Sequence, residues 1–98
     1  MIIGILKMNI FIPWSHSLKE KRMVTKSICA KVRNKYNVSI GEVDCQDIHQ
    51  TIVLGLSYVT TDQGRANSIA DRVLNFIENS TEGNIINIDR EIYGYTSL

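Results

Sequence analysis

Four residues near the middle of the chain could carry out chemistry if they lay together: Glu42, Asp44, Asp47 and His49. Carboxylates and imidazoles bind metal ions and transfer protons, and a metal site needs three or four of them converging on one point. In an extended chain Glu42 and Asp44 point the same way, so Asp47 and His49 would have to fold back toward them. Aspartate is also a common turn residue between strands. We therefore rank an enzyme or metal site at Glu42, Asp47 and His49 last among the functional hypotheses. We assign no metal, cofactor or catalytic residue and favour a protein that is not an enzyme.

The cysteines and the short motifs add no catalytic signature. Cys29 and Cys45 are too few for a disulfide framework and lack the C-x-x-C spacing of zinc or redox sites. The sequence contains no G-x-G-x-x-G string, no Walker loop and no evident Ser-His-Asp set. No motif in the chain therefore points to a particular reaction.

A group of basic residues points to binding instead. Seven of the eleven basic residues lie between residues 17 and 36, opposed there only by Glu20, so this segment carries +6 and the rest of the chain −5. At roughly 100° per helical residue, four of them form a stripe roughly 60° wide: Lys19, Arg22, Lys26 and Arg33. Such a stripe can contact phosphates along a nucleic-acid backbone, although surface helices are also lysine-rich for solubility. We take these four residues as candidate nucleic-acid contacts.

Lys21 differs from the other basic residues of this segment. It projects toward the apolar side of the expected helix, one turn before Val24. A lysine in that position either extends its ammonium group to the surface or pairs with a carboxylate. The sequence predicts a structural ion pair between Lys21 and Glu42, which lies on a neighbouring strand.

Hydrophobic periodicity predicts the elements that position these residues. The first strand ends at Pro13, and Ser17 with Glu20 forms a capping box that opens the first helix. Strands are expected at 2–14, 38–43, 51–60 and 85–92, and helices at 17–36 and 63–79. The order β-α-β-β-α-β predicts an α+β, ferredoxin-like sandwich, in which one antiparallel four-stranded sheet carries both helices on one face. We expect a single domain over residues 1–98, with a loose tail from about residue 93.

The sheet of such a sandwich has one face that no helix covers. RNA-recognition domains stack bases on aromatic residues there, and Phe11 and Tyr58 are the aromatic candidates in this chain. No string of alternating aromatic residues and glycines of the RNA-recognition type occurs, however. A mostly apolar open face would instead be buried by a second subunit, and this favours a homodimer.

Composition limits the class of protein. With 98 residues, 44% hydrophobic and 21% charged, the chain reads as one ordinary globular domain. Its net charge of +1 argues against a dedicated nucleic-acid-binding arm. Neither a signal peptide nor an apolar stretch long enough to span a bilayer is recognisable, so we expect a cytoplasmic protein without membrane contact.

Several segments together resemble one protein family. They are SLKEKR at 17–22, NVSIGEV at 37–43, QD at 46–47 and DRVLNFIE at 71–78. The chain is similar over about residues 2–92 to the YlxP-like proteins, domain of unknown function 503. That resemblance implies the ferredoxin-like fold and no established activity, cofactor or catalytic residue. It also implies a link to translation, because bacterial genes of the family often lie beside translation and ribosome-maturation genes.

These observations support two functional hypotheses. The first is a non-enzymatic binding module that acts on ribosomal RNA or on a ribosome-associated complex, such as a ribosomal protein, through the basic helix stripe. The second is a dimeric protein-interaction or small-ligand-binding domain that uses the open sheet face.

Overall fold

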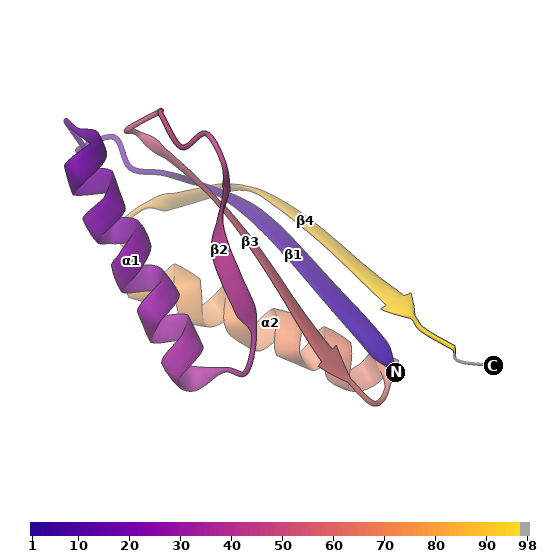
Figure 1. Cartoon of the computed structure of the whole chain (residues 1–98). Helices are drawn as coiled ribbons and strands as arrows, with labels where there is room; N and C mark the ends of the chain where they lie inside the picture. The colour runs from indigo at the N-terminus through magenta and orange to yellow at the C-terminus, as the bar shows by residue number, and fades with distance from the viewer. Residues whose placement is uncertain (97–98) are drawn as a thin grey trace.

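The structure is a computed structural model of the chain, and residues 1–96 of it are described. Six elements follow one another: β1 (Ile2–Phe11), α1 (Leu18–Lys35), β2 (Ser39–Asp44), β3 (Thr51–Thr60), α2 (Gln63–Ser80) and β4 (Asn84–Gly94). Both helices lie on the same face of a twisted sheet, and β1 begins at the same end of the molecule at which β4 ends (Figure 1).

All strand pairs are antiparallel, and the strand order is β2-β3-β1-β4. The central strands β1 and β3 pair along their whole length, from Ile2 opposite Thr60 to Phe11 opposite Thr51. The sequence-based prediction of a ferredoxin-like β-α-β-β-α-β sandwich is therefore confirmed.

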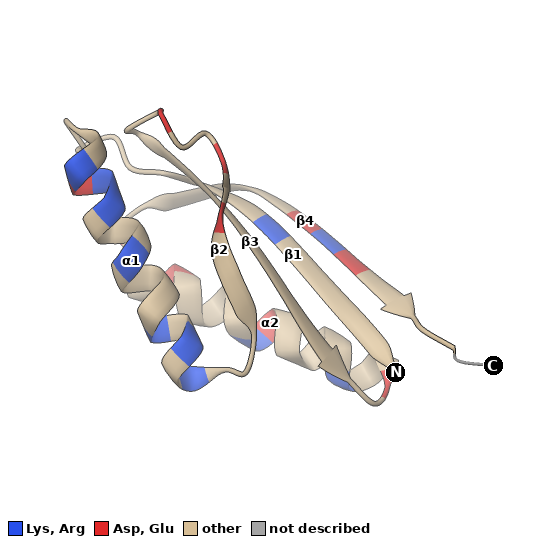
Figure 2. Cartoon of the chain, in the orientation of Figure 1, with Lys and Arg blue, Asp and Glu red and all other residues tan. Residues whose placement is uncertain are grey.

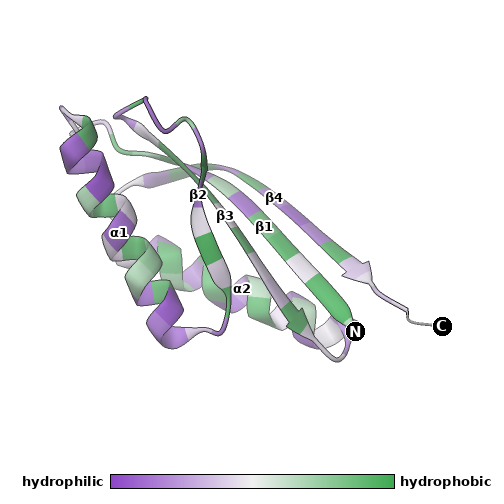
Figure 3. Cartoon of the chain, in the orientation of Figure 1, coloured by the Kyte–Doolittle hydropathy of each residue, from purple (hydrophilic) through white to green (hydrophobic). Residues whose placement is uncertain are grey.

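The core lies between the sheet and the two helices. Alternate residues of the central strands point toward the helices, and Leu6, Met8 and Ile10 of β1 are fully buried there. They pack in one cluster with residues of β3 and of both helices: Ile52, Leu54, Ile28, Val32, Val73 and Ile77. β1 is largely hydrophobic, whereas β4, which lies at the edge of the sheet, carries long hydrophilic stretches (Figure 3).

Each helix begins at a side-chain cap. The Ser17 hydroxyl accepts a hydrogen bond from the backbone N–H of Glu20 at 3.1 Å, and Asp62 accepts one from Arg65 at 2.8 Å. The Glu20 carboxylate reaches back one residue further than the expected capping box, to the N–H of His16 at 2.9 Å. Neither helix in the described part of the chain has the length and apolar character that a membrane crossing requires.

Both edge strands contain an irregularity. In β2, Val43 has no partner between Glu42, opposite Leu54, and Asp44, opposite Val53. In β4, Ile86 is the extra residue where the register against β1 shifts between Asn9 and Ile10. Each bulge leaves an apolar side chain more than half exposed, 53% for Val43 and 55% for Ile86.

The last strand is longer than the sequence indicated. Tyr93 and Gly94 pair with Ile3 and Ile2, and the N–H of Tyr95 donates to the carbonyl of Met1 at 2.8 Å. The expectation of a loose tail from about residue 93 is therefore wrong for residues 93–95. Because β1 begins at Ile2, its backbone can pair with β4 as far as Gly94, and the residue pattern of β4 alone does not reveal this. Residues 97–98 of the predicted tail lie outside the described residues.

We predict that Gly4→Ala destabilises the fold. The ring of Tyr58, the residue opposite Gly4 on β3, lies where a Cβ at Gly4 would stand, and its hydroxyl donates to the Ala66 carbonyl at 2.6 Å. Displacing that ring should lower the free energy of unfolding by about 1–3 kcal/mol, measured by urea denaturation.

Gly41→Ala is the matched control, because no atom lies within 4 Å of a Cβ placed there. It should leave the urea midpoint unchanged or slightly raised. Equal midpoints for the two variants would contradict this account of Gly4.

Candidate functional site

The basic stripe of α1 is exposed, and its C-terminal end lies beside β2. We call Lys19, Arg22, Lys26 and Arg33 the basic flank; all four are exposed. Basic residues follow α1 along its whole length, while acidic residues gather on β2 and the loop after it (Figure 2). The guanidinium of Arg33 donates to the carbonyl of Ile40 at 2.6 Å, which places the C-terminal end of the flank against the edge of β2.

The members of the basic flank are not equivalent. Arg33 serves the fold, because it satisfies a backbone carbonyl of an edge strand. In residues 1–96, the structure shows no ion pair and no side-chain hydrogen bond for Lys19, Arg22 or Lys26; the ion pairs there involve other basic residues. These three side chains can therefore bind an anionic ligand without first breaking a contact.

Lys21 is turned inward and is completely buried. Its Nζ lies 2.7 Å from Glu42 Oε2 and donates to the carbonyls of Cys45 at 2.5 Å and Ile48 at 2.8 Å. Two of the three N–H donors of the ammonium group are used in these hydrogen bonds, and the contact with Glu42 is an ion pair. Within the described residues, the buried Oε2 of Glu42 accepts no hydrogen bond. The structure thus brings Lys21 and Glu42 together in an ion pair that holds the loop between β2 and β3 against α1, where a ligand has no access to the ammonium group.

The acidic residues near the middle of the chain do not converge. Glu42 points inward to Lys21, whereas the Asp44 carboxylate accepts from the N–H of Cys45 at 2.7 Å. Cys45 has a φ of 55°, a left-handed conformation that turns the chain into the loop carrying Asp47 and His49. Across residues 1–96 no three histidine, cysteine or acidic side chains lie close enough together to hold a metal ion.

Cys29 is buried in the core, near Glu42 of the Lys21–Glu42 ion pair. Burial raises the pKa of its thiol; the positive charge of Arg33 opposes this and the carboxylate of Glu42 adds to it. The Cys29 thiol therefore stays protonated near neutral pH, which makes it a weak nucleophile.

Only one of the two aromatic candidates lies on the face of the sheet that no helix covers. Phe11 lies on that face and is 37% exposed, whereas Tyr58 faces the helices and is buried. Burial raises the pKa of the Tyr58 phenol. Tyr58 therefore cannot stack a base on this face. At one end of the open face Val59, Ile3 and Tyr93 lie side by side on β3, β1 and β4. The middle of that face is charged: Lys7, Asp89 and Glu91.

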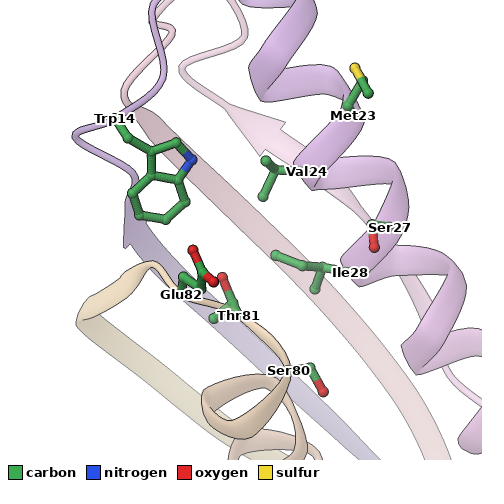
Figure 4. Close-up of a pocket in the computed structure, with 8 residues that line it drawn as sticks. All are labelled: Trp14, Met23, Val24, Ser27, Ile28, Ser80, Thr81 and Glu82. Carbon is green, nitrogen blue, oxygen red and sulfur yellow. The ribbon is translucent and has the colours of Figure 1, made fainter.

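A groove between α1 and the turn after α2 was missed by the sequence reasoning. It has a volume of about 390 Å³. Its lining residues are Trp14, Met23, Val24, Ser27, Ile28, Ser80, Thr81 and Glu82, and we call it the Trp14 groove. The indole of Trp14 and the carboxylate of Glu82 lie on one side, across from Val24 and Ile28 on α1 (Figure 4). One signal was available: Trp14 is the sole tryptophan and follows directly after Pro13 in a connecting segment.

Comparisons with known proteins identify relatives but no activity. The family described as "Protein of unknown function (DUF503)" matches residues 3–90. The chain is 38% identical over 81 residues to the "Uncharacterized protein YlxP" of Bacillus subtilis (strain 168), covering 83% of this chain and 88% of that protein.

Solved structures extend the comparison to the fold. The crystal structure of At3g17210 from Arabidopsis thaliana superposes with a TM-score of 0.50 at 16% identity, covering 98% of this chain and 97% of that one. The solution structure of a de novo designed protein with ferredoxin fold, LFR1 1, has a TM-score of 0.48 at 15% identity, over 99% of this chain and 88% of the design. At such identities the likeness concerns the fold alone.

We predict that Lys21→Met destabilises the protein more than removal of any exposed lysine. The substitution leaves the Glu42 carboxylate without its cation and two loop carbonyls without their donor, so the free energy of unfolding should fall by about 3–5 kcal/mol in urea denaturation. Glu42→Gln should lower the free energy of unfolding by less, because Lys21 still donates to both loop carbonyls and the glutamine amide oxygen can still accept a hydrogen bond.

Lys31→Met, an exposed position on the same helix, serves as the matched control. Hydrogen exchange should show faster exchange of loop amides at 45–50 in Lys21→Met than in this control. A loss of stability no larger than that of the control would show that the buried pair does not hold the loop.

Proposed function

Since this chain belongs to the DUF503 family, whose description gives no function, we propose from its surface that it is a non-enzymatic module that binds RNA through the basic flank. Ribosomal RNA is the first candidate ligand, because the family resemblance implies a link to translation. One observation carries the proposal: Lys19, Arg22 and Lys26 are exposed on one side of α1 without an ion pair in the described part of the chain.

The spacing of the basic flank suits a phosphate backbone. A helix rises 1.5 Å per residue, so the flank extends roughly 20 Å from Lys19 to Arg33. A basic flank of that length can contact several successive phosphates, and each phosphate that it neutralises releases counterions. Contacts of this kind are strongly salt-dependent and carry little sequence information by themselves.

The flank is also held in place before any ligand arrives. Buried contacts of Lys21 attach the first turns of α1 to the β2–β3 loop, and Arg33 attaches its last turn to β2. An RNA ligand therefore has to order only the three free side chains and not the helix that carries them.

We predict RNA binding that weakens steeply with salt and is lost on charge reversal. The variant Arg22→Glu/Lys26→Glu should bind structured ribosomal RNA at least tenfold more weakly than the unmodified protein at low salt, as measured by fluorescence anisotropy. The slope of log K against log salt should also become shallower, by roughly 0.7–0.9 for each lost phosphate contact. Arg33 is left unchanged because it also supports β2.

The control Lys31→Glu/Arg72→Glu makes the same change in net charge at exposed positions outside the flank. It should bind nearly as well as the unmodified protein. Equal losses in both variants would mean that net charge alone drives binding, and absence of binding at low salt would refute the proposal.

The apolar end of the open sheet face favours a second candidate function, self-association. Val59 is 64% exposed, Tyr93 48% and Ile5 39%, and they surround Ile3. The middle of the same face carries one basic residue, Lys7, and two acidic residues, Asp89 and Glu91. In a dimer with two-fold symmetry, Lys7 of each copy can therefore pair with an acidic residue of the other copy. This arrangement supports a homodimer that packs sheet against sheet.

For this second candidate we predict that the protein sediments as a dimer and that Val59→Asp makes it monomeric. A carboxylate buried in the apolar part of the interface has no partner there, which favours dissociation. Analytical ultracentrifugation at micromolar concentration measures the effect. Ile48→Asp, at a loop residue that is 52% exposed away from this face, should remain dimeric, and a monomeric unmodified protein would exclude the homodimer.

A further inference from the structure

The Trp14 groove combines an aromatic surface with one free carboxylate. Trp14 is 40% exposed, and Val24 and Ile28 form the apolar wall across from it on α1 (Figure 4). The hydroxyl of Ser80 donates to the Phe76 carbonyl, and that of Thr81 accepts from the N–H of Gly83. Glu82 is exposed and no hydrogen bond or ion pair of its carboxylate occurs within residues 1–96. Glu82 is therefore the carboxylate available to a ligand, and the exposed Ser27 hydroxyl, for which the described residues show no hydrogen bond, is a second polar group there.

The opposite rim of the groove adjoins the basic flank. Met23 forms part of this rim and is 65% exposed. Side chains three and four positions apart are neighbours on a helix surface, so Lys26 and Lys19 of the basic flank stand beside Met23. Neither lysine lines the groove itself, so a ligand in the groove contacts Glu82, and an anionic group that extends from it past Met23 comes beside the two lysines.

This charge arrangement selects the class of occupant. A simple cation would meet the lysines, and a simple anion would meet Glu82. A nucleotide matches both ends, because its base carries N–H donors and a flat π surface while its phosphate is anionic. An apolar protein side chain would use the apolar wall of the groove but neither charge.

We propose that the Trp14 groove holds one unpaired base of the RNA strand whose phosphates bind the basic flank. This inference rests on the proposed function and adds a base-binding position to it. The base stacks on Trp14, and its exocyclic amine donates to Glu82, a pairing that suits the N4 amine of cytosine. The ligand class is therefore single-stranded RNA with an unpaired cytosine next to phosphates at Lys19 and Lys26.

Fluorescence tests this placement directly, because Trp14 is the only tryptophan in the chain. Hexacytidine should quench its emission, whereas an abasic hexamer with the same phosphates should bind without quenching it. Quenching by N-acetylleucine amide but by neither hexamer would identify a site for an apolar protein side chain and overturn the inference.

Variants separate stacking from charge, with affinity measured by anisotropy of labelled hexacytidine. Trp14→Ala should weaken binding roughly 5- to 100-fold, the range expected for loss of one stacked base, and Trp14→Phe should recover most of it. Glu82→Gln should reduce the preference for hexacytidine over hexauridine several-fold. Tyr93→Leu, which removes an exposed aromatic residue on the open sheet face, should change nothing.

The outcomes distinguish this inference from the proposed function. If Trp14→Ala and Trp14→Phe bind hexacytidine like the unmodified protein while Arg22→Glu/Lys26→Glu does not, the groove holds no base and the basic flank still binds RNA. A loss in Tyr93→Leu alone would move the stacked base to the sheet and overturn the inference. Absence of binding by the unmodified protein at low salt would refute both.

Discussion

The arrangement of α1, β2 and the β2–β3 loop depends on one buried ammonium group. Lys21 Nζ contacts a carboxylate on β2 and two carbonyls of the loop, and its own backbone belongs to the first turns of α1. A buried charge is costly unless every donor finds an acceptor, and the left-handed turn at Cys45 helps bring two backbone acceptors to it. Three segments are therefore fixed relative to one another by a single side chain, and the direction of the basic flank follows from it.

The basic residues of this chain divide into two kinds that the net charge does not distinguish. Lys21, Arg33 and Arg90 complete the fold: Arg90 joins β4 to α2 through Asp71 and Asn67. Lys19, Arg22 and Lys26 extend from the same molecule without such partners in the residues described. Met23, which lies between Arg22 and Lys26 in the sequence, is on the rim of the Trp14 groove. The same helix therefore presents a surface for anionic groups next to a surface for apolar groups.

Sequence periodicity predicted the elements closely because the signals were local. The bounds of β3 and the two helix caps followed from alternation and capping residues, and the direction of Lys21 followed from helical geometry. Alternation along β1 puts Leu6, Met8 and Ile10 on one face and Ile5, Lys7 and Phe11 on the other, but alternation alone does not say which face the helices cover. The Lys21–Glu42 pair joins two segments and was still predictable, because an inward lysine requires a carboxylate partner. Two other features that need distant segments were not predictable. The Trp14 groove requires α1 to lie beside the end of α2, and the extension of β4 requires the start of β1.

The bulges at Val43 and Ile86 affect how the molecule behaves at high concentration. β2 and β4 are the two free edges of the sheet, and each carries its irregularity beside the same stretch of the central strands, near Asn9 and Val53. A regular edge would accept a strand from another molecule, and repeated addition would build a fibril. Because the ladder of backbone donors and acceptors is interrupted on both sides, neither edge offers an unbroken template for amyloid-like growth.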